Sequence, residues 1–310
     1  MLIDEELAEI FPNKDMLLTI GVFDGVHLGH KYLISKLKEL AGEGNLMSGV
    51  VTFRQHPLEV LAPETELPYL TSLEEKVRLL KNEGVDAVVT LSFTPEFAQL
   101  SANQFTGLLK KHLRMRGLVV GPDFALGRNR EGNSDKLCAI GKYLDFSVTV
   151  VPPVKINGEV VSSTAVRNAI ADGNMKRVLS LIGRPFSLQG RIIAGSGKGA
   201  ELGFPTANLE IDPKQTLPPE GVYATRANFG GKVYRSVTNI GKRPTFGENP
   251  RSVETYVMDY AGDLYGHQLR IDIIERLRGE EKFETVEELK KQIAEDIERS
   301  KSILDSRTVE

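Results

Sequence analysis

Two histidines stand three residues apart in a glycine-rich stretch near the start of the chain. The stretch GVFDGVHLGH contains His27 and His30, with Gly25 and Gly29 beside them. If a helix begins here, its unpaired N–H groups and its dipole attract an anion. Histidines on one side of the first turn can then donate hydrogen bonds to a polyphosphate as its charge grows. Taken alone, the pair also fits a structural role or, less well, a metal site.

A second stretch places hydroxyls and a guanidinium close together. In SSTAVR, Ser163 and Thr164 are followed by Arg167. Hydroxyl donors beside a planar charged fork suit a triphosphate. Alone, the stretch fits a serine-capped helix with a surface arginine. Together, the two stretches favour a nucleotide site.

Two loops between these stretches are expected to follow strands. They are TFRQHP (52–57) and GPDFALG (121–127). The carboxyl ends of parallel strands share one edge of a sheet, where ligands bind. There Asp123 and Phe124 could give polar and stacking contacts to a ring, although each loop alone fits an ordinary turn.

The second half carries a different set of candidate groups. Gly197 and Gly199, in GSGKG, would let backbone N–H groups wrap an anion. Thr206 and Asn208 offer oxygens of the kind that Mg²⁺ binds. Glu254, in an expected strand, could act as a base in phosphoryl transfer, although alone it fits a solvated strand residue.

The elements of the first half alternate between strands and helices. Strands are expected at 16–23, 48–53, 86–93, 117–121 and 147–151. This alternation predicts a Rossmann-like α/β domain, a parallel sheet with helices on both faces.

Helix boundaries in this half have local signals. Thr71 with Glu74, and Ser101 with Gln104, have capping-box spacing. Gly42 or Gly44 should end the first helix, which follows the histidines, and the helix after Ser101 should stop near 117.

After residue 190 the pattern changes to short strands separated by turns. Closely spaced strands without intervening helices predict a small antiparallel β-barrel. A closing helix should begin at Thr285 and bury Val286, Leu289, Ile293 and Ile297 on one face. We expect the linker in 182–190.

Length and composition limit the number of domains and the classes of function that the chain can have. A chain of 310 residues predicts two domains, which we place at 1–183 and 184–310. The net charge of −3, with no basic excess in either half, argues against general nucleic-acid binding. The single cysteine, the acidic N-terminal segment and the lack of a run of about 18 apolar residues predict a cytoplasmic protein without a membrane span.

Several of these stretches together resemble one enzyme family. FDGVHLGH resembles the HxGH signature of adenylyl- and cytidylyltransferases. SSTAVR resembles the second signature, SSTxxR, that one branch of these transferases carries. In the second half, five stretches look like riboflavin kinase: LGFPTANL (202–209), GVY (221–223), NIG (239–241), PTFG (244–247) and DLYG (263–266). From about residue 16 to the final helix, the chain therefore resembles the prokaryotic bifunctional riboflavin kinase/FAD synthetases.

The resemblance implies two reactions and a role for each motif. The barrel would transfer the γ-phosphoryl of ATP to riboflavin, and the first domain would adenylylate the resulting FMN to FAD, releasing pyrophosphate. Catalysis would fall to Glu254 in the barrel and to His27 and His30 in the first domain. The expected nucleotide-binding residues are Gly21, Phe23, Gly25, Gly29, Ser163, Thr164, Arg167, Gly197, Gly199, Thr206 and Asn208, the last two also holding Mg²⁺; Asp123, Phe124, Arg278 and Phe283 would contact flavin.

The chain departs from the family pattern at two positions. Tyr256 stands where a histidine is common, and Leu126 where a phenylalanine is common.

Two other functions remain open on the sequence: a nucleotidyltransferase for another phosphate, and a non-catalytic flavin sensor. The PTAN run with Glu254 argues against the first, and the intact HxGH and SSTxxR motifs argue against the second. The oligomeric state is not predicted.

Overall fold

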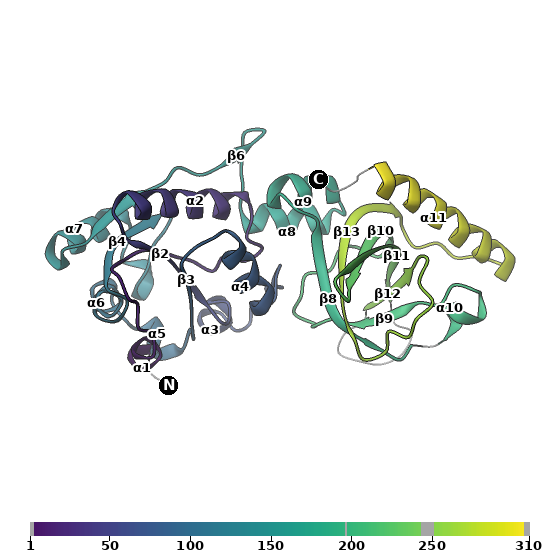
Figure 1. Ribbon diagram of the computed structural model, residues 1–310, viewed down its shortest axis with the longest axis horizontal. Helices are drawn as coiled ribbons and strands as arrows, with labels where there is room; N and C mark the ends of the chain where they lie inside the picture. Colours follow the sequence, from purple (N-terminus) through teal and green to yellow (C-terminus); the bar gives the residue numbers. More distant parts are fainter. Residues whose placement is uncertain (1–2, 196, 243–250, 307–310) are drawn as a thin grey trace. The chain divides into compact units, whose positions relative to one another are not determined.

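The computed structural model describes residues 3–195, 197–242 and 251–306. By its contacts the chain divides into two compact units, Met1–Ser163 and Thr164–Glu310 (Figure 1).

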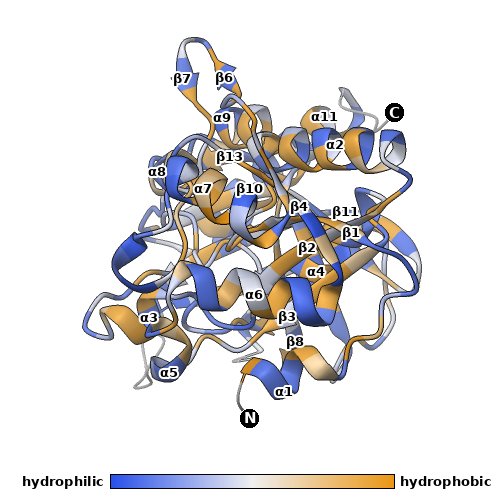
Figure 2. Ribbon diagram, turned by 90° about the vertical axis from the view of Figure 1, so that its left-hand side faces the viewer, coloured by the Kyte–Doolittle hydropathy of each residue, from blue (hydrophilic) through white to orange (hydrophobic). Residues whose placement is uncertain are grey.

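The first unit is built on a five-stranded parallel sheet with strand order β3-β2-β1-β4-β5. Its strands are β1 (Met16–Ile20), β2 (Met47–Phe53), β3 (Ala87–Leu91), β4 (Met115–Val120) and β5 (Ser147–Val150). The predicted fold class of this half is confirmed. The central strands are hydrophobic along most of their length (Figure 2), as expected for strands buried on both faces.

Helices cover both faces of this sheet. The longer ones are α1 (Ile3–Ala8), α2 (Leu28–Glu43), α4 (Leu73–Asn82), α6 (Ala102–Leu113) and α7 (Ser134–Leu144). The short elements are α3 (Leu58–Leu61), α5 (Pro95–Ala98), η1 (Arg128–Arg130) and the hairpin strands β6 (Lys155–Ile156) and β7 (Glu159–Val160).

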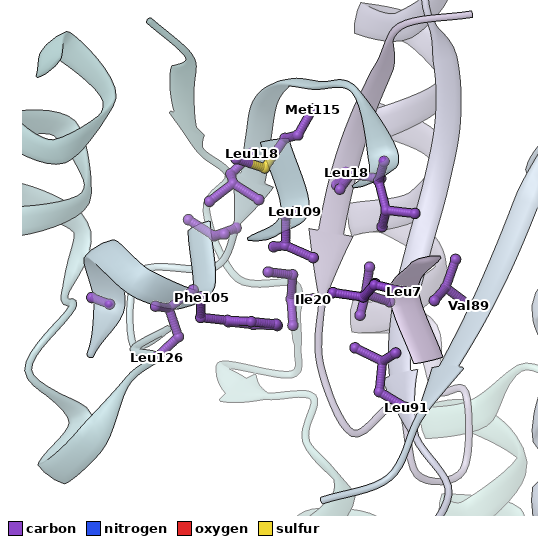
Figure 3. Packing of buried hydrophobic residues seen from close by; sticks show 14 of the residues in the cluster. Leu7, Leu18, Ile20, Val89, Leu91, Phe105, Leu109, Met115, Leu118 and Leu126 are labelled. Carbon is purple, nitrogen blue, oxygen red and sulfur yellow. The ribbon is translucent and has the colours of Figure 1, made fainter. Parts of the chain in front are cut away.

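Each face has its own hydrophobic core. On one face, Leu37 of α2 and Leu80 of α4 pack with Leu17 of β1. On the other, Phe105 and Leu109 of α6 belong to a cluster that includes Ile20 and Leu118 (Figure 3). The alternation of buried side chains along β1 therefore fixes the sheet between two helical layers.

Two of the predicted helix boundaries need correction. The capping box at Ser101 and Gln104 is present, but this helix ends at Leu113, because Arg114 adopts a left-handed conformation. The N-cap of α4 is Ser72, not Thr71, and it accepts from the N–H of Glu75. The Thr71 hydroxyl is used elsewhere, since it accepts a hydrogen bond from the Gly25 N–H. The first helix ends as expected, with Gly44 as its C-cap.

The second unit contains a closed barrel with strand order β10-β11-β12-β9-β8-β13, which confirms the predicted barrel. Its strands are β8 (Phe186–Ile193), β9 (Ala207–Glu210), β10 (Gly221–Phe229), β11 (Lys232–Lys242), β12 (Arg251–Val257) and β13 (Gln268–Arg278). Its helices are α8 (Ser163–Ala171, whose first residue belongs to the other unit), α9 (Met175–Ile182), α10 (Lys198–Glu201) and α11 (Val286–Ser306). Most of the expected linker is therefore strand β8, and α9 packs on β8 and β13.

Helix α11 lies along the barrel wall formed by β10, β11 and β13 (Figure 1). Its N-terminal box is present, since the Thr285 hydroxyl accepts from the Glu288 N–H. Ile297 and Leu304 are buried against the wall, but Val286 is 52% exposed, so the predicted apolar face begins one turn later.

Among the residues that the structure describes, we find no helix with the length and apolar character needed to cross a membrane.

Candidate active sites

The loop between β1 and α2 carries the two histidines. Three of its residues have positive φ angles: Phe23 (53°), Gly25 (81°) and Val26 (39°). A positive φ is costly for a β-branched residue such as Val26, so surrounding contacts must hold the loop in place. A side chain at Gly25 would also collide with Leu70, and one at Gly29 would crowd the His27 ring and the Val161 carbonyl. Both glycines therefore make room for protein atoms.

His27 and His30 stack on each other at the start of α2. Their ring centroids lie 3.6 Å apart with an interplanar angle of 17°, which confirms that they share one side of the first turn. His27 is 5% exposed and is the N-cap of α2: its Nδ1 accepts from the His30 N–H at 3.3 Å. Because Nδ1 is an acceptor, the proton of neutral His27 resides on Nε2.

His30 is held in its neutral form. Burial is the main cause that keeps its pKa well below 6.5, followed by the charge that His27 carries when protonated and by the charge of Lys76. Its Nδ1 atom is buried and has no hydrogen-bond partner within the described part of the chain. The ring of Phe23, a residue that is only 2% exposed, lies edge-on to the His30 ring, with the two ring centroids 5.0 Å apart. A buried, unsatisfied polar atom of this kind is a candidate site of ligand contact.

The second signature is joined to this loop by a hydrogen bond. The Ser163 hydroxyl donates to the Asp24 carbonyl oxygen at 2.9 Å, and α8 begins at Ser163 as expected. Thr164 is exposed and Arg167 is partly buried; both belong to the second compact unit. Their contact with a nucleotide remains a prediction.

The two intermediate loops follow β2 and β4, as predicted. Asp123 is exposed, and its carbonyl oxygen accepts from Arg130 at 3.0 Å. Phe124 is half-buried and packs against the core of the first unit. Both loops lie at the carboxyl edge of the sheet, where the His27 loop also begins. A flavin contact for Asp123 or Phe124 remains a prediction.

The barrel unit has a cavity of about 700 Å³, here called the larger cavity. Strand residues form one wall and α11 forms another, with Leu289, Ile293 and Ile297 contributing apolar surface. Five expected site residues line it together: Gly199, Thr206, Glu254, Arg278 and Phe283. The cavity has the size and the mainly apolar lining typical of a site for a molecule as large as a flavin.

Glu254 stands at the centre of a polar row across three strands. It is directly opposite Asn208 of β9 on one side and Asn239 of β11 on the other. Directly paired side chains in antiparallel strands project to the same face of the sheet. The row thus presents one carboxylate between two amides, and Glu254 and Asn239 both line the larger cavity.

Asn239 is a site residue that sequence reasoning did not assign. The NIG run that contains it contributed to the family resemblance, but its alignment with Glu254 depends on strand register. The sequence identifies Tyr256 only as a departure from the family pattern. It lines the same cavity, and its ring lies edge-on to Phe204 at 5.9 Å.

A smaller cavity of about 240 Å³ lies next to the larger one, and Thr206 lines both. Its other walls come from Ile192, from Pro205 and from the DLYG segment, including Tyr265. Thr206 therefore stands at the boundary between two neighbouring ligand-sized spaces.

Arg278 connects the end of β13 to α11. Its guanidinium donates to both carboxylate oxygens of Asp296, at 2.9–3.2 Å, and the two side chains are 15% and 6% exposed. The same guanidinium lies 5.7 Å from the centre of the Phe283 ring. The Arg278–Asp296 ion pair therefore forms part of the lining of the larger cavity, together with Phe283.

The glycine loop of the second half is only partly described. Gly197 has a φ of 77°, and the segment after it forms α10. A side chain at Gly199 would crowd the Phe204 carbonyl and the Thr206 hydroxyl. The predicted wrapping of an anion by this loop remains a prediction, and PTFG (244–247) lies outside the described residues.

Two kinds of metal site can be distinguished: one built from histidines, cysteines and carboxylates, and a Mg²⁺ site beside a bound nucleotide. Across residues 3–195, 197–242 and 251–306, no group of three or more His, Cys, Asp or Glu side chains could hold a metal ion. Thr206 and Asn208 offer a hydroxyl and an amide oxygen beside Glu254. That donor set fits Mg²⁺ bound mainly through nucleotide phosphates.

Comparisons with known proteins agree with this geometry. The FAD synthetase family model matches residues 11–165, and the riboflavin kinase model matches 182–304. The chain is 41% identical to a bifunctional riboflavin kinase/FMN adenylyltransferase of Escherichia coli K12, covering 92% of this chain and 91% of that protein. It is 34% identical to the protein of that name from Listeria monocytogenes, covering 90% of each.

A solved structure has the same fold over nearly the whole chain. It is that of a protein from Streptococcus pneumoniae described as a macrolide-efflux protein. The TM-score is 0.88 at 31% identity, covering 95% of this chain and 96% of that one.

Fold and sites thus define a two-part enzyme, with a nucleotidyltransferase-type sheet followed by a kinase-type barrel. The chain belongs to the bifunctional riboflavin kinase/FMN adenylyltransferase family. The family, the fold class and the two transferase activities predicted from the sequence are confirmed.

Proposed function

We propose that the larger and the smaller cavity each take one substrate of riboflavin phosphorylation. The larger cavity would hold riboflavin, with its ring system against the apolar side chains of α11, Phe204 and Tyr256. The smaller cavity would hold part of ATP. The observation that carries this assignment is Thr206, which lines both spaces and would meet the transferred phosphoryl group.

In this arrangement Glu254 acts as the general base. Its carboxylate faces the larger cavity and would take the proton of the attacking ribityl hydroxyl. Asn208 and Asn239 flank it and would hold its position and that of the substrate. Phosphoryl transfer needs alignment and charge stabilisation more than covalent help.

Mg²⁺ would be held by Thr206 and Asn208 together with the phosphates. When bound, it neutralises charge that develops on the phosphate oxygens. Thr206 and Asn208 orient the nucleotide, and the Glu254 carboxylate remains available for the proton.

In the first unit, FMN would be adenylylated by the histidine loop. His27 would donate a hydrogen bond from Nε2 to the triphosphate. Neutral His30 would contact the nucleotide through Nδ1, the buried ring atom that has no hydrogen-bond partner among the described residues. We further propose that Ser163, Thr164 and Arg167 contact the same triphosphate, and that Asp123 and Phe124 contact the flavin. The functional domains would be 1–183 and 184–310. The lone cysteine fits a reducing cytoplasm as the place of action.

Product analysis tests this function. The protein is incubated with riboflavin, ATP and Mg²⁺, and flavins and pyrophosphate are resolved by chromatography. We expect FMN first, then FAD with an equal amount of pyrophosphate, and loss of FMN formation when EDTA is added. A protein that forms FAD from FMN but no FMN from riboflavin would contradict the kinase assignment.

A further inference from the structure

The histidine loop is supported from behind by one segment, Leu70–Lys76. The buried carboxylate of Asp24 accepts hydrogen bonds from the backbone N–H groups of Leu70, at 2.9 Å, and Thr71, at 3.1 Å. In return, the Thr71 hydroxyl accepts from the Gly25 N–H at 3.2 Å. These bonds connect residues more than forty positions apart and fasten the loop at two successive residues.

This support explains a local anomaly in α4. Ser72, not Thr71, caps the helix, although both hydroxyls stand at its start. The Thr71 side chain is therefore committed to the loop, and the Ser72 side chain to the helix. The strained Val26, two residues beyond Asp24, lies in the part of the loop that these bonds hold.

Lys76 lies one turn further along α4 and is 6% exposed. Its ammonium donates to the carbonyl oxygen of Phe53, the last residue of β2, at 2.7 Å. Burial lowers the pKa of Lys76, and the neighbouring charge of Asp24 opposes that effect. The positive charge of Lys76 also lowers the pKa of His30. A lysine is almost never buried this far unless its ammonium is paired or hydrogen-bonded, and here the Phe53 carbonyl supplies that partner.

We propose that Thr71 and Lys76 are positioning residues for adenylyl transfer, holding the histidine loop and the end of β2 in the geometry that binds the nucleotide. Neither would touch substrate: Lys76 is buried, and the Thr71 hydroxyl is bonded to the loop. The brace they form joins three segments, the loop 23–26, the end of β2 and the start of α4. The inference rests on the proposed adenylyl transfer at this loop.

The physical argument is one of preorganisation. A loop with several positive φ angles has other conformations of lower local energy, so its functional shape must be imposed by outside contacts. Misplacement of binding groups by about 1 Å can cost about 100-fold in rate. Loss of a brace should therefore slow adenylyl transfer while leaving the rest of the molecule folded.

The chain offers matched variants for the test. Thr71→Val removes the acceptor of the Gly25 N–H but keeps the shape, whereas Thr71→Ser keeps the hydroxyl. Ser72→Ala removes the helix cap from the adjacent position without altering the loop bonds. Lys76→Met removes the buried charge with a similar chain length.

Each variant is assayed for FAD formation from FMN and ATP, and separately for riboflavin phosphorylation. We expect Thr71→Val and Lys76→Met to lower kcat for FAD formation by about 10- to 100-fold. Thr71→Ser and Ser72→Ala should stay near the wild-type rate, and riboflavin phosphorylation should be unchanged in all four. If Ser72→Ala slows FAD formation as much as Thr71→Val does, or if neither Thr71→Val nor Lys76→Met slows it, the proposal is wrong.

A spectroscopic measurement separates this proposal from a general loss of stability. The ring protons of His30 are titrated by NMR in the wild type and in Lys76→Met. Removing a positive neighbour should raise the pKa of His30, while it stays below 6.5 because burial remains the main cause. Ser72→Ala should leave the titration unchanged. A wild-type protein that forms no FAD would refute the adenylyl-transfer assignment, whereas an unshifted His30 in Lys76→Met would refute the brace.

Discussion

His27 has two roles that depend on a single nitrogen atom. By accepting the His30 N–H at Nδ1, it caps α2 and fixes its own neutral tautomer. Its remaining donor, Nε2–H, is the group that can meet a phosphate oxygen. The glycine at position 29 leaves room for this ring, because a side chain there would touch it.

The lowered pKa of His30 predicts how stability changes with pH. Below about pH 6.5 the unfolded chain protonates this histidine, while the folded chain does not. The unfolded state then binds more protons, so this residue lowers the free energy of unfolding as pH falls from about 6.5. We expect His30→Gln to lose less stability than the wild type between pH 7 and pH 5, measured by urea unfolding. An equal loss in both proteins would show that His30 titrates normally.

Tyr256 allows a prediction about riboflavin binding. It projects from the same face of β12 as Glu254, and its ring forms an aromatic wall with Phe204. Tyr256→Ala should raise the KM for riboflavin by about tenfold with little change in kcat, since a packed aromatic contact is lost but no reacting group.

Tyr256→Phe keeps the ring and serves as the matched control, with a KM near that of the wild type. A fall in kcat with unchanged KM in Tyr256→Ala would instead place Tyr256 in the chemical step.

At the scale of elements, α11 is fastened to the barrel by a buried ion pair. Arg278 and Asp296 are bonded through two nitrogens, and both side chains are largely shielded from water. Asp296→Ala would leave the Arg278 charge without this partner, which costs about 3–5 kcal/mol in a buried pair. We expect a lower unfolding temperature for the barrel unit and weaker riboflavin binding, because α11 forms one wall of the larger cavity.

Glu298→Ala is the control on the same helix. Glu298 pairs with Lys301 at 2.8 Å, but both are at the surface, so its removal should change stability little. Equal destabilisation by the two substitutions would contradict the importance of the buried pair.

The elements were largely predictable where the signal was local. Strand pattern and the box at Ser101 predicted β1, β2 and the start of α6, because these depend on hydrophobic periodicity and neighbouring side chains. Thr71 was misassigned since its hydroxyl pairs with Gly25, a contact far along the chain. Asn239 was missed for the same reason: its place beside Glu254 is set by strand register.

At the scale of the whole molecule, the motifs and the compact units divide the chain differently. The sequence predicts a domain boundary between residues 183 and 184. The contacts instead divide the chain into compact units between residues 163 and 164, within the SSTAVR stretch. Helix α9 buries Met175, Val178 and Leu181 and packs on strands of the barrel. A change in composition marks the start of the barrel strands, but it carries no information about which unit receives the preceding helices.

Two separate active sites in one chain are the central claim of this account. The direct test compares His30→Ala and Glu254→Gln, each shown to be folded by its thermal transition, in reactions resolved by chromatography. With riboflavin, ATP and Mg²⁺, His30→Ala should accumulate FMN without FAD. Glu254→Gln should leave riboflavin unconverted, yet form FAD at the wild-type rate when FMN is supplied. Loss of both activities in either folded variant, or an unchanged rate of FAD formation in His30→Ala, would contradict the account.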